Sequence, residues 1–355
     1  MASTKARLRF GIFDWLDDSR RGLAETWEQR LKMLEYADHA GFFAYHLAEH
    51  HGTPLSTAPS PNLFLMALAQ RTKQLRFGPM THLLPMYHPI RLIEEICILD
   101  QVSGGRLEIG VGRPASPHEA ALYSVEMTEA RAVAHEALAV VTSGLASGEV
   151  NFDGKHYQFK DVRLLLRPVQ RPYPPLWYPT TNFGSIPWIA EQGFSLLTLF
   201  LWASPVAMGD QFRLYRRVLA EHAGRPNRFN GHVAQPNHGF GIQIYVAEIE
   251  DEARRVAREA HAVFFENFNY LWAQHDDAGR HARLADFDTF VNQGLMTCGS
   301  PETVRATLQK YLEITGADYL AGVFAFGGLT EQQVLRSLHL FTTQVMPHLR
   351  ASGAA

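Results

Sequence analysis

The sequence has 355 residues, of which 46% are hydrophobic and 19% are charged, a composition typical of a folded chain with a large core. Its formal net charge of -3 provides no basic surface for nucleic acid, so we expect no nucleic-acid partner. Only Cys97 and Cys298 are present, far apart and without metal-ligand spacing, which fits a reducing, cytoplasmic location and excludes a disulfide framework.

Short apolar runs alternate with amphipathic runs along most of the chain. The apolar runs predict strands over 8–14, 42–47, 75–84, 107–111, 176–180, 195–201, 239–247 and 319–326. The amphipathic runs predict helices over 25–40, 62–71, 90–101, 128–145, 185–192, 205–222, 250–270 and 331–346, with a further helix starting at Ser300-Pro301-Glu302. Eight strands, each followed by a helix, predict a (β/α)₈ TIM barrel that occupies residues 1–355 as a single domain.

No part of the sequence predicts a membrane span or a signal peptide. The amino terminus lacks the apolar core of a signal peptide. The most apolar run, residues 194–203, is about half the roughly 20 residues that a helix needs to cross a bilayer. We therefore interpret this run as a buried strand and expect no membrane association.

Two segments depart from the alternation and are interpreted as insertions, near 149–175 and 272–298. In the first, an Asp153-Gly154 turn between aromatic residues indicates a β-hairpin. In the second, the polar stretch 273–295 suggests a lid or a surface excursion. We expect both segments to form the mouth of the pocket.

The residues Gly110-Val111-Gly112-Arg113-Pro114-Ala115 offer a dinucleotide-binding alternative, because they fit the G-x-G-x-x-A pattern. They fall on the fourth predicted strand, however, and no strand that ends in an acidic residue follows about 20 residues later. This pattern is therefore set aside.

The stretch His46-Leu47-Ala48-Glu49-His50 offers a zinc-peptidase alternative, because it matches H-x-x-E-H. That chemistry requires both histidines on one face of a helix, whereas the segment is predicted to be a strand. On a strand His46 and His50 point to one face and Glu49 to the other, so Glu49 could not act over a metal that the histidines hold. We expect no metal site.

A TIM barrel carries its chemistry at the carboxyl ends of the strands. The residues predicted there are Phe13, Asp14, His50, His51, Thr81, His82, Arg113, Thr181, Asn182, Gly184 and Ser185. Adjacent histidines at a strand end are candidates for acid–base chemistry, and ordinary structural histidines are the alternative. The aromatic residues are interpreted as barrel core rather than cofactor walls: Phe10, Phe13, Phe77, Trp177, Trp188 and Phe200.

Two of these strand ends suggest a phosphate pocket. Arg113 follows two glycines that permit close backbone approach, and precedes Ser116-Pro117-His118-Glu119, which has the pattern of a capping box. Residues 181–185 lead into a helix, where free backbone N–H groups and small hydroxyls would converge on an anion. A surface arginine and an ordinary helix cap are the alternatives.

Several motifs resemble the bacterial luciferase-like flavin monooxygenases over nearly the whole length of the chain. They are Glu49-His50-His51, the stretch from Leu75-Arg76-Phe77-Gly78 to His88-Pro89, the stretch from Leu99 to Arg113, Gly299-Ser300-Pro301-Glu302, and Met346-Pro347. The block from His88-Pro89 to Arg113 is the most specific of these, since its spacing agrees as well as its residue types.

The resemblance implies a role for each matching position. It places the catalytic histidine at His50, a flavin-phosphate arginine at Arg113 and a cis non-proline peptide under the flavin ring at Met80-Thr81. The phosphate loop falls on Thr181, Asn182, Gly184 and Ser185.

Two positions depart from the luciferase catalytic subunit. Gly112 replaces its reactive cysteine, and Thr181 replaces a phosphate-loop glutamate. These departures argue against light emission and leave flavin binding intact, because Thr181 removes a negative charge beside a phosphate.

The resemblance also implies the activity: reduced FMN, delivered by an NAD(P)H-dependent flavin reductase, and O₂ oxygenate a small organic molecule. A deazaflavin-dependent oxidoreductase of the same superfamily and a non-catalytic flavin-binding protein are the alternatives. The resemblance also implies a homodimer that forms through helices 62–71 and 90–101. These helices carry more apolar residues than a single core-facing stripe needs: Leu63, Leu65, Leu68, Ile93, Ile96 and Cys97.

Overall fold

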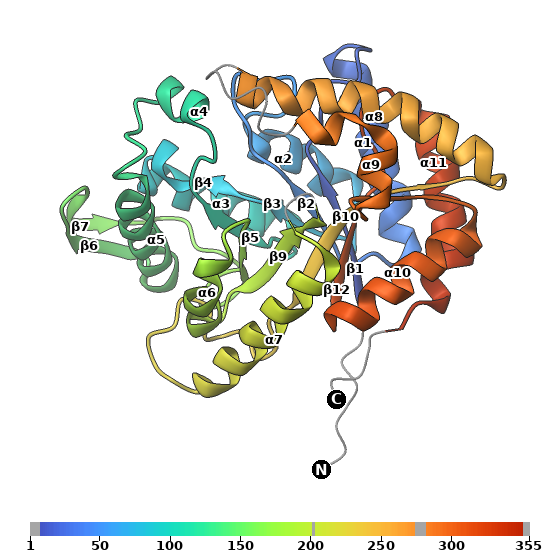
Figure 1. Ribbon diagram of the computed structural model, residues 1–355. Helices are drawn as coiled ribbons and strands as arrows, with labels where there is room; N and C mark the ends of the chain where they lie inside the picture. The colour runs from blue at the N-terminus through green and yellow to red at the C-terminus, as the bar shows by residue number, and fades with distance from the viewer. Residues whose placement is uncertain (1–7, 201–202, 274–281, 351–355) are drawn as a thin grey trace.

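A computed structural model describes residues 8–200, 203–273 and 282–350 (Figure 1). Its strands are β1 (Arg9–Asp14), β2 (Ala44–Leu47), β3 (Arg76–Pro79), β4 (His82–Leu83), β5 (Ile109–Gly112), β6 (Glu149–Asp153), β7 (Gln158–Arg163), β8 (Leu176–Pro179), β9 (Ser195–Leu199), β10 (His238–Val246), β11 (Met296–Gly299) and β12 (Tyr319–Val323). The strands β2, β4, β10, β11 and β12 are buried along their whole length, as expected for a parallel sheet covered by helices.

The parallel strands follow the order β3-β2-β1-β12-β10-β9-β8-β5-β4. β3 and β4 are two pieces of the single strand predicted over 75–84, interrupted at Met80-Thr81, and both pieces meet β5: β4 pairs with it directly, and Phe77 of β3 bridges Leu107 just before it. The sheet therefore returns to its starting edge and forms a nearly closed barrel with eight strand positions. The predicted (β/α)₈ architecture is confirmed.

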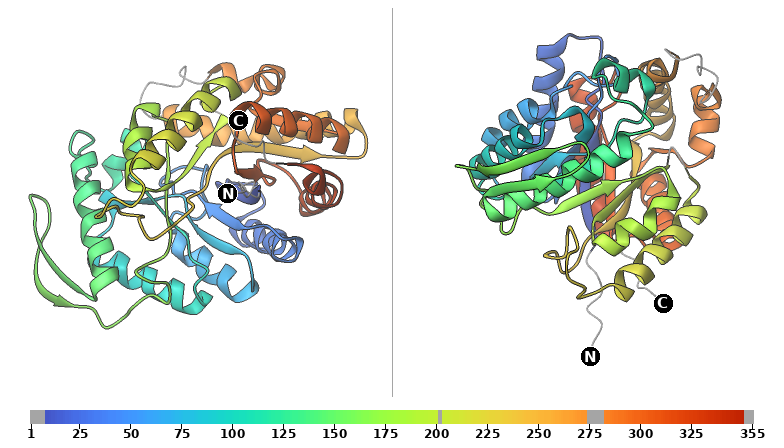
Figure 2. Two further views of the ribbon diagram at one scale, coloured as in Figure 1. Left: turned by 90° about the horizontal axis from the view of Figure 1, so that it is seen from below. Right: turned by 90° about the vertical axis from the view of Figure 1, so that its left-hand side faces the viewer.

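The helices are α1 (Leu23–Ala40), α2 (Pro61–Arg71), α3 (Pro89–Ser103), α4 (Pro117–Leu122), α5 (Ala130–Ser147), α6 (Ile186–Gln192), α7 (Pro205–Glu221), α8 (Glu250–Ala273), α9 (Phe287–Asn292), α10 (Pro301–Thr315) and α11 (Glu331–Leu340). Seen from below in Figure 2, helices surround the strands on most sides. Within the described ranges, none of them is long and apolar enough to cross a bilayer.

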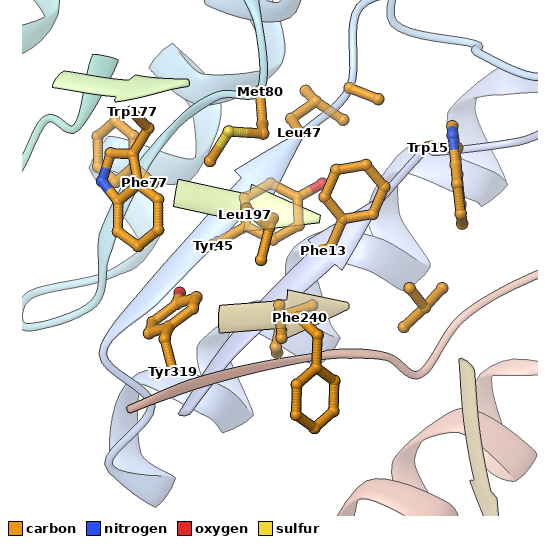
Figure 3. Close-up of a cluster of buried hydrophobic side chains, with 14 of the residues drawn as sticks. Phe13, Trp15, Tyr45, Leu47, Phe77, Met80, Trp177, Leu197, Phe240 and Tyr319 are labelled. Carbon is orange, nitrogen blue, oxygen red and sulfur yellow. The ribbon is translucent and has the colours of Figure 1, made fainter. Parts of the chain in front are cut away.

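Large buried side chains pack on both faces of the barrel strands (Figure 3). Trp177 and Tyr319 point into the barrel, where both rings contact His46, whereas Tyr45 on the neighbouring position of β2 packs outward against Phe64 of α2. Because the inward-pointing rings occupy the interior, ligand space is left only toward the carboxyl ends of the strands.

The hairpin predicted in the first insertion is confirmed, since β6 and β7 pair in an antiparallel two-stranded sheet. It extends outward beyond α5, at the left of Figure 1. None of its residues lines the main cavity, so the prediction that this insertion builds the pocket mouth is wrong. The hairpin instead packs its aromatic side chains outside the barrel, where Phe159 contacts His88.

The second insertion contains more regular structure than its polar composition predicts. Its described part holds α9 and the strand β11, which pairs with the upper half of β10. Gln243 of β10 pairs with Val323 of β12 on one side and with Met296 of β11 on the other. β11 therefore pairs with the same edge of β10 as β9 does, starting just after the last residue that pairs with β9. β11 escapes prediction because its short run directly follows the polar stretch 273–295 and is grouped with it. The remainder of the expected lid, residues 274–281, lies outside the described residues.

Candidate functional site

A cavity of about 500 Å³ opens at the carboxyl ends of the barrel strands. It is bordered by the segments that follow β1, β2, β3, β5 and β8, by β9, and by the last turns of α8. Its volume lies within the range of small-molecule and cofactor sites. The structure brings the following predicted site residues to its lining: His50, Met80, Thr81, Arg113, Thr181, Asn182 and Ser185. Gly184 is not among the lining residues.

The His50 side chain is held by the carboxylate of Glu119, a residue that the sequence pattern had placed in a capping box. Its Nδ1–H donates to Glu119 Oε1 at 2.8 Å, and the backbone N–H of His51 donates to the same oxygen at 3.1 Å. Glu119 is fully buried, while the His50 side chain is 18% exposed and lines the cavity. This bond fixes the ring and leaves Nε2 as the nitrogen available to a ligand.

The capping-box interpretation of Ser116 and Glu119 is therefore half right. Ser116 Oγ accepts hydrogen bonds from the backbone N–H groups of His118 and Glu119, as a cap does. The Glu119 side chain turns to His50 instead of returning to the Ser116 backbone, because the loop after β2 lies against the start of α4. Of the described residues, none donates to Glu119 Oε2.

The expected alternation of Glu49 and His50 across a strand is also wrong, since β2 ends at Leu47 and both residues line the cavity. Glu49 accepts hydrogen bonds from His51 Nε2 at 2.8 Å and from the Tyr87 hydroxyl at 2.9 Å. Burial raises the pKa of Glu49 above its usual value, against the opposing effect of these donors. Glu49 and His51 thus brace the loop that carries His50.

The H-x-x-E-H residues do not converge. His46 lies in the barrel interior, where its Nε2 is 2.7 Å from the Tyr319 hydroxyl, and burial lowers its pKa to about 3. His50 faces Glu119 instead. In the part of the chain that the structure describes, no group of three or more histidine, cysteine or acidic side chains could hold a metal ion. The arrangement gives no support to zinc chemistry.

The peptide between Met80 and Thr81 is cis, as the resemblance implies, and both residues face the cavity. The glycines of the set-aside G-x-G-x-x-A pattern belong to β5 and lie beside it. A Cβ on Gly112 would come within 2.7 Å of Thr81 Oγ1, and one on Gly110 would come within 3.0 Å of Met80 Cα. These glycines therefore serve the close contact between β5 and the Met80-Thr81 peptide.

The open end of the cavity carries two guanidinium groups. Arg113 follows β5, and Arg131, which sequence reasoning missed, lies in the first turn of α5; both are exposed and line the cavity. Neither makes an ion pair or a hydrogen bond with the described residues. Both act electrostatically on Tyr178 of β8, which places them near the same point. Only the fold shows that Arg131 belongs here, because it lies on a helix rather than at a strand end.

In the loop after β8, two of the backbone donors that were predicted to be free are engaged within the loop. The N–H of Gly184 donates to Asn182 Oδ1, and the N–H of Ser185 donates to the Asn182 carbonyl, both at 3.0 Å. The hydroxyls of Thr181 and Ser185 make no hydrogen bond with the described residues and remain available. Two guanidiniums and two hydroxyls that line the same cavity suit a phosphate group.

The remaining strand-end candidates have structural partners. Asp14 accepts a hydrogen bond from buried Arg30 at 3.0 Å. His82 Nε2 is 2.9 Å from Asn62 Oδ1, and burial lowers the His82 pKa to about 3. Phe13 is buried in the core, as predicted, but its side chain also lines the cavity. The prediction that this residue belongs to the core and not to a ligand site is therefore only half right.

A family profile described as luciferase-like monooxygenase matches residues 8–319. The chain belongs to this family. It is 37% identical to the uncharacterized protein y4wF of Sinorhizobium fredii over 91% of this chain and 92% of that protein. It is 24% identical to the oxygenase component of a flavin-dependent trigonelline monooxygenase of Acinetobacter baylyi, over 84% of this chain and 78% of the relative.

Solved structures share the fold over almost the whole chain. The monooxygenase RslO1 from Streptomyces bottropensis superposes with a TM-score of 0.82 at 25% identity, covering 96% of this chain and 99% of that one. The oxygenating constituent of 3,6-diketocamphane monooxygenase from Pseudomonas putida, in complex with FMN, superposes with a TM-score of 0.82 at 21% identity. The match covers 98% of this chain and 100% of that one. A coenzyme F420-dependent tetrahydromethanopterin reductase from Methanopyrus kandleri superposes with a TM-score of 0.71 at 19% identity. The match covers 97% of this chain and 100% of that one.

Proposed function

We propose that the protein is a flavin-dependent monooxygenase that uses reduced FMN and O₂ to oxygenate a small organic substrate. One observation carries the proposal: a single cavity combines an open end with two unpaired guanidiniums and a deeper part that holds the His50–Glu119 pair. The first feature suits the phosphate of a flavin nucleotide, and the second suits proton transfer beside its ring.

The residues present fit FMN. Arg113 and Arg131 would hold the phosphate together with the hydroxyls of Thr181 and Ser185, while Asn182 keeps their loop in shape. The Met80-Thr81 peptide would support the ring, since both residues face the cavity next to β5. Bound reduced flavin would supply the activation of O₂.

His50 would move a proton at the reacting centre. Because Glu119 accepts from Nδ1, the other ring nitrogen, Nε2, can accept a proton from a substrate and return it. Buried Glu119 stabilises the ring when it is charged, as a carboxylate behind a catalytic histidine does. Glu49 and His51 hold the loop and keep His50 at the cavity.

Equilibrium binding of reduced FMN, oxidised FMN and the deazaflavin coenzyme tests the proposal. We expect reduced FMN to bind best and Arg113→Ala to weaken it about 10- to 100-fold, because a charge-assisted hydrogen bond to phosphate is lost. Arg225→Ala is the matched control, since Arg225 is an exposed arginine outside the cavity lining and should leave the affinity unchanged.

The outcomes separate the alternatives. A preference for the deazaflavin coenzyme would favour hydride transfer, a reaction consistent with the fold shared with the F420-dependent reductase. Tight flavin binding without O₂ consumption in the presence of substrates would favour a non-catalytic flavin-binding protein. If none of the three coenzymes bound, the flavin proposal would be withdrawn.

The proposal includes an NAD(P)H-dependent flavin reductase as the donor of reduced FMN. It is supported by the trigonelline relative, which is named as the oxygenase component of its enzyme. Turnover with NADH should therefore require a separate reductase. Oxygenation by the isolated protein with NADH and FMN alone would contradict this part.

The proposal also includes a homodimer. Most of the apolar residues that suggested it are buried within one chain: Leu65, Leu68, Ile93, Ile96 and Cys97. Leu63 on α2 is 66% exposed, and Ile98 and Val102 on the adjacent α3 are 41% and 43% exposed, so a smaller apolar surface remains. Sedimentation of a monomer at micromolar concentration would contradict the dimer.

A further inference from the structure

The cavity has an apolar wall opposite its cationic end. Phe13 and Trp15 come from the end of β1, Leu55 from the loop after β2, and Phe268 and Leu271 from the last turns of α8. All five are at least 95% buried although they line the cavity. Three separate segments therefore combine to form one apolar surface.

The aromatic rings of this wall are in continuous contact. Phe13 packs edge-on against Trp15 with ring centres 4.8 Å apart, Trp15 lies 5.1 Å from Phe264, and Phe264 lies 6.0 Å from Phe268. Figure 3 shows Phe13 and Trp15 side by side, with Met80 on the other side of Phe13. Such a run of rings is rigid and costs little conformational entropy when a ligand packs on it.

The order of the strands sets the distance between the two ends. In the ring of eight strand positions, β1 and β8 are four positions apart and therefore lie across the barrel from each other. Arg113 and Arg131 act on Tyr178 of β8, whereas the apolar wall follows β1. A flavin nucleotide anchored by its phosphate at β8 would reach toward the centre and leave the wall to another molecule.

Among the residues that the structure describes, no cation lines the apolar wall. Besides Arg113 and Arg131, the charged side chains of the described cavity lining are Glu49, His50 and Glu119. Both carboxylates are fully or almost fully buried and already accept hydrogen bonds from His51 or His50. An anionic ligand on the wall would therefore meet carboxylates and aromatic rings and lose its hydration without a partner.

We propose that the apolar wall selects a largely apolar substrate that carries no negative charge and whose single polar group reaches His50. This inference rests on the proposed function, since it assigns the part of the cavity that the flavin leaves free. It names Phe13, Trp15, Leu55, Phe268 and Leu271 as the residues that set specificity, and it excludes carboxylates and sulfonates as preferred substrates.

Calorimetric titration with two ligands of matched skeleton tests the charge preference. The ligands are cyclohexyl methyl ketone and cyclohexanecarboxylate, each added to the protein saturated with oxidised FMN, so that the phosphate already occupies Arg113 and Arg131. We expect the ketone to bind at least about tenfold more tightly than the carboxylate, because the anion must be desolvated on the wall without a partner. Equal or tighter binding of the carboxylate, or no binding of the ketone, overturns the proposal.

Neighbouring residues on α8 provide a matched pair of variants. Leu271 lines the cavity, while Tyr270 is 40% exposed and lies outside the lining. Leu271→Ala should weaken ketone binding about tenfold, since buried apolar contact is lost, and Tyr270→Ala should leave it unchanged. Circular dichroism verifies that both variants fold. Unchanged ketone affinity in folded Leu271→Ala places the ligand elsewhere and overturns the assignment.

FMN affinity, measured in the same titrations, keeps the two proposals distinguishable. FMN binding together with a preference for the carboxylate over the ketone removes the substrate assignment and leaves the flavin proposal intact. If the ketone binds selectively but FMN does not bind at all, the flavin proposal is removed. The apolar wall is then a ligand site on a protein that is not a flavoenzyme.

Discussion

Glu119 shows how much of the site depends on single residues that are distant in the sequence. It lies 69 positions after His50, yet its carboxylate accepts from both the His50 ring and the His51 backbone. A fully buried carboxylate in this place orients the imidazole. Its proposed role is to position His50 rather than to contact the substrate.

Substitution at these two positions separates proton transfer from positioning. With reduced FMN supplied, His50→Ala should lower the turnover number about 100- to 10,000-fold, because a general acid–base group is lost. Glu119→Gln retains an acceptor for Nδ1 but removes the charge, so we expect a smaller loss of about 10- to 100-fold. Rapid-mixing kinetics measures both, with the FMN dissociation constant as the control. Full activity of His50→Ala would exclude its proposed role.

Among the elements, the interrupted strand formed by β3 and β4 has the most consequence for the site. Its two pieces both lie against β5, and the Met80-Thr81 peptide between them faces the cavity. β5 can approach this closely because Gly110 has no side chain. A Cβ there would collide with the Pro79 carbonyl and lie 3.0 Å from Met80 Cα.

Gly110→Ala should therefore damage both stability and the site. Because backbone atoms must shift to admit the methyl group, we expect a loss of about 1 to 3 kcal/mol in the free energy of unfolding and weaker FMN binding. Urea unfolding and FMN titration measure the two effects. Gly328→Ala is the control, since a Cβ there has only one contact within 4 Å, at 3.7 Å from Val263. Equal stability of both variants would show that β5 has room to adjust.

For the whole molecule, a buried ionic network joins segments from both ends of the chain. Arg30 of α1 pairs with Asp14 and Asp17 after β1, and Asp17 Oδ2 accepts from Asn267 of α8 at 3.1 Å and from the Gly327 N–H at 2.8 Å. Burial raises the pKa of Asp17 to about 6, an effect that Arg30 opposes. The network thereby fixes α8, and with it the apolar wall, against the barrel.

The raised Asp17 pKa makes stability depend on pH in a defined direction. The folded protein binds the Asp17 proton more tightly than the unfolded chain, so this residue lowers stability as pH rises from about 4 to about 6. In Asp17→Asn this dependence is absent. The variant should therefore gain about 2 kcal/mol relative to the natural protein between about pH 4.5 and 7.5. Urea unfolding across that range measures the difference, and a constant difference would contradict the assignment.

The sequence by itself determines the strand and helix alternation, and therefore the barrel, because each apolar run has only one way to be buried in that architecture. It also places His50, Arg113 and Thr181 at strand ends, where a barrel must bring them together. Family motifs locate Met80 and Thr81 in the same way. These features depend on local patterns and on strand order, which a sequence displays directly.

Only the tertiary structure decides which side chains become partners. Glu119 follows a cap pattern but pairs with His50, and Arg131 reaches the cavity from a helix. Asn182 accepts from two of the backbone donors that had been assigned to a ligand, those of Gly184 and Ser185. The apolar wall combines β1 with α8, which are far apart in the chain. These contacts depend on how the loops pack on one another, and no periodicity in the sequence encodes that packing.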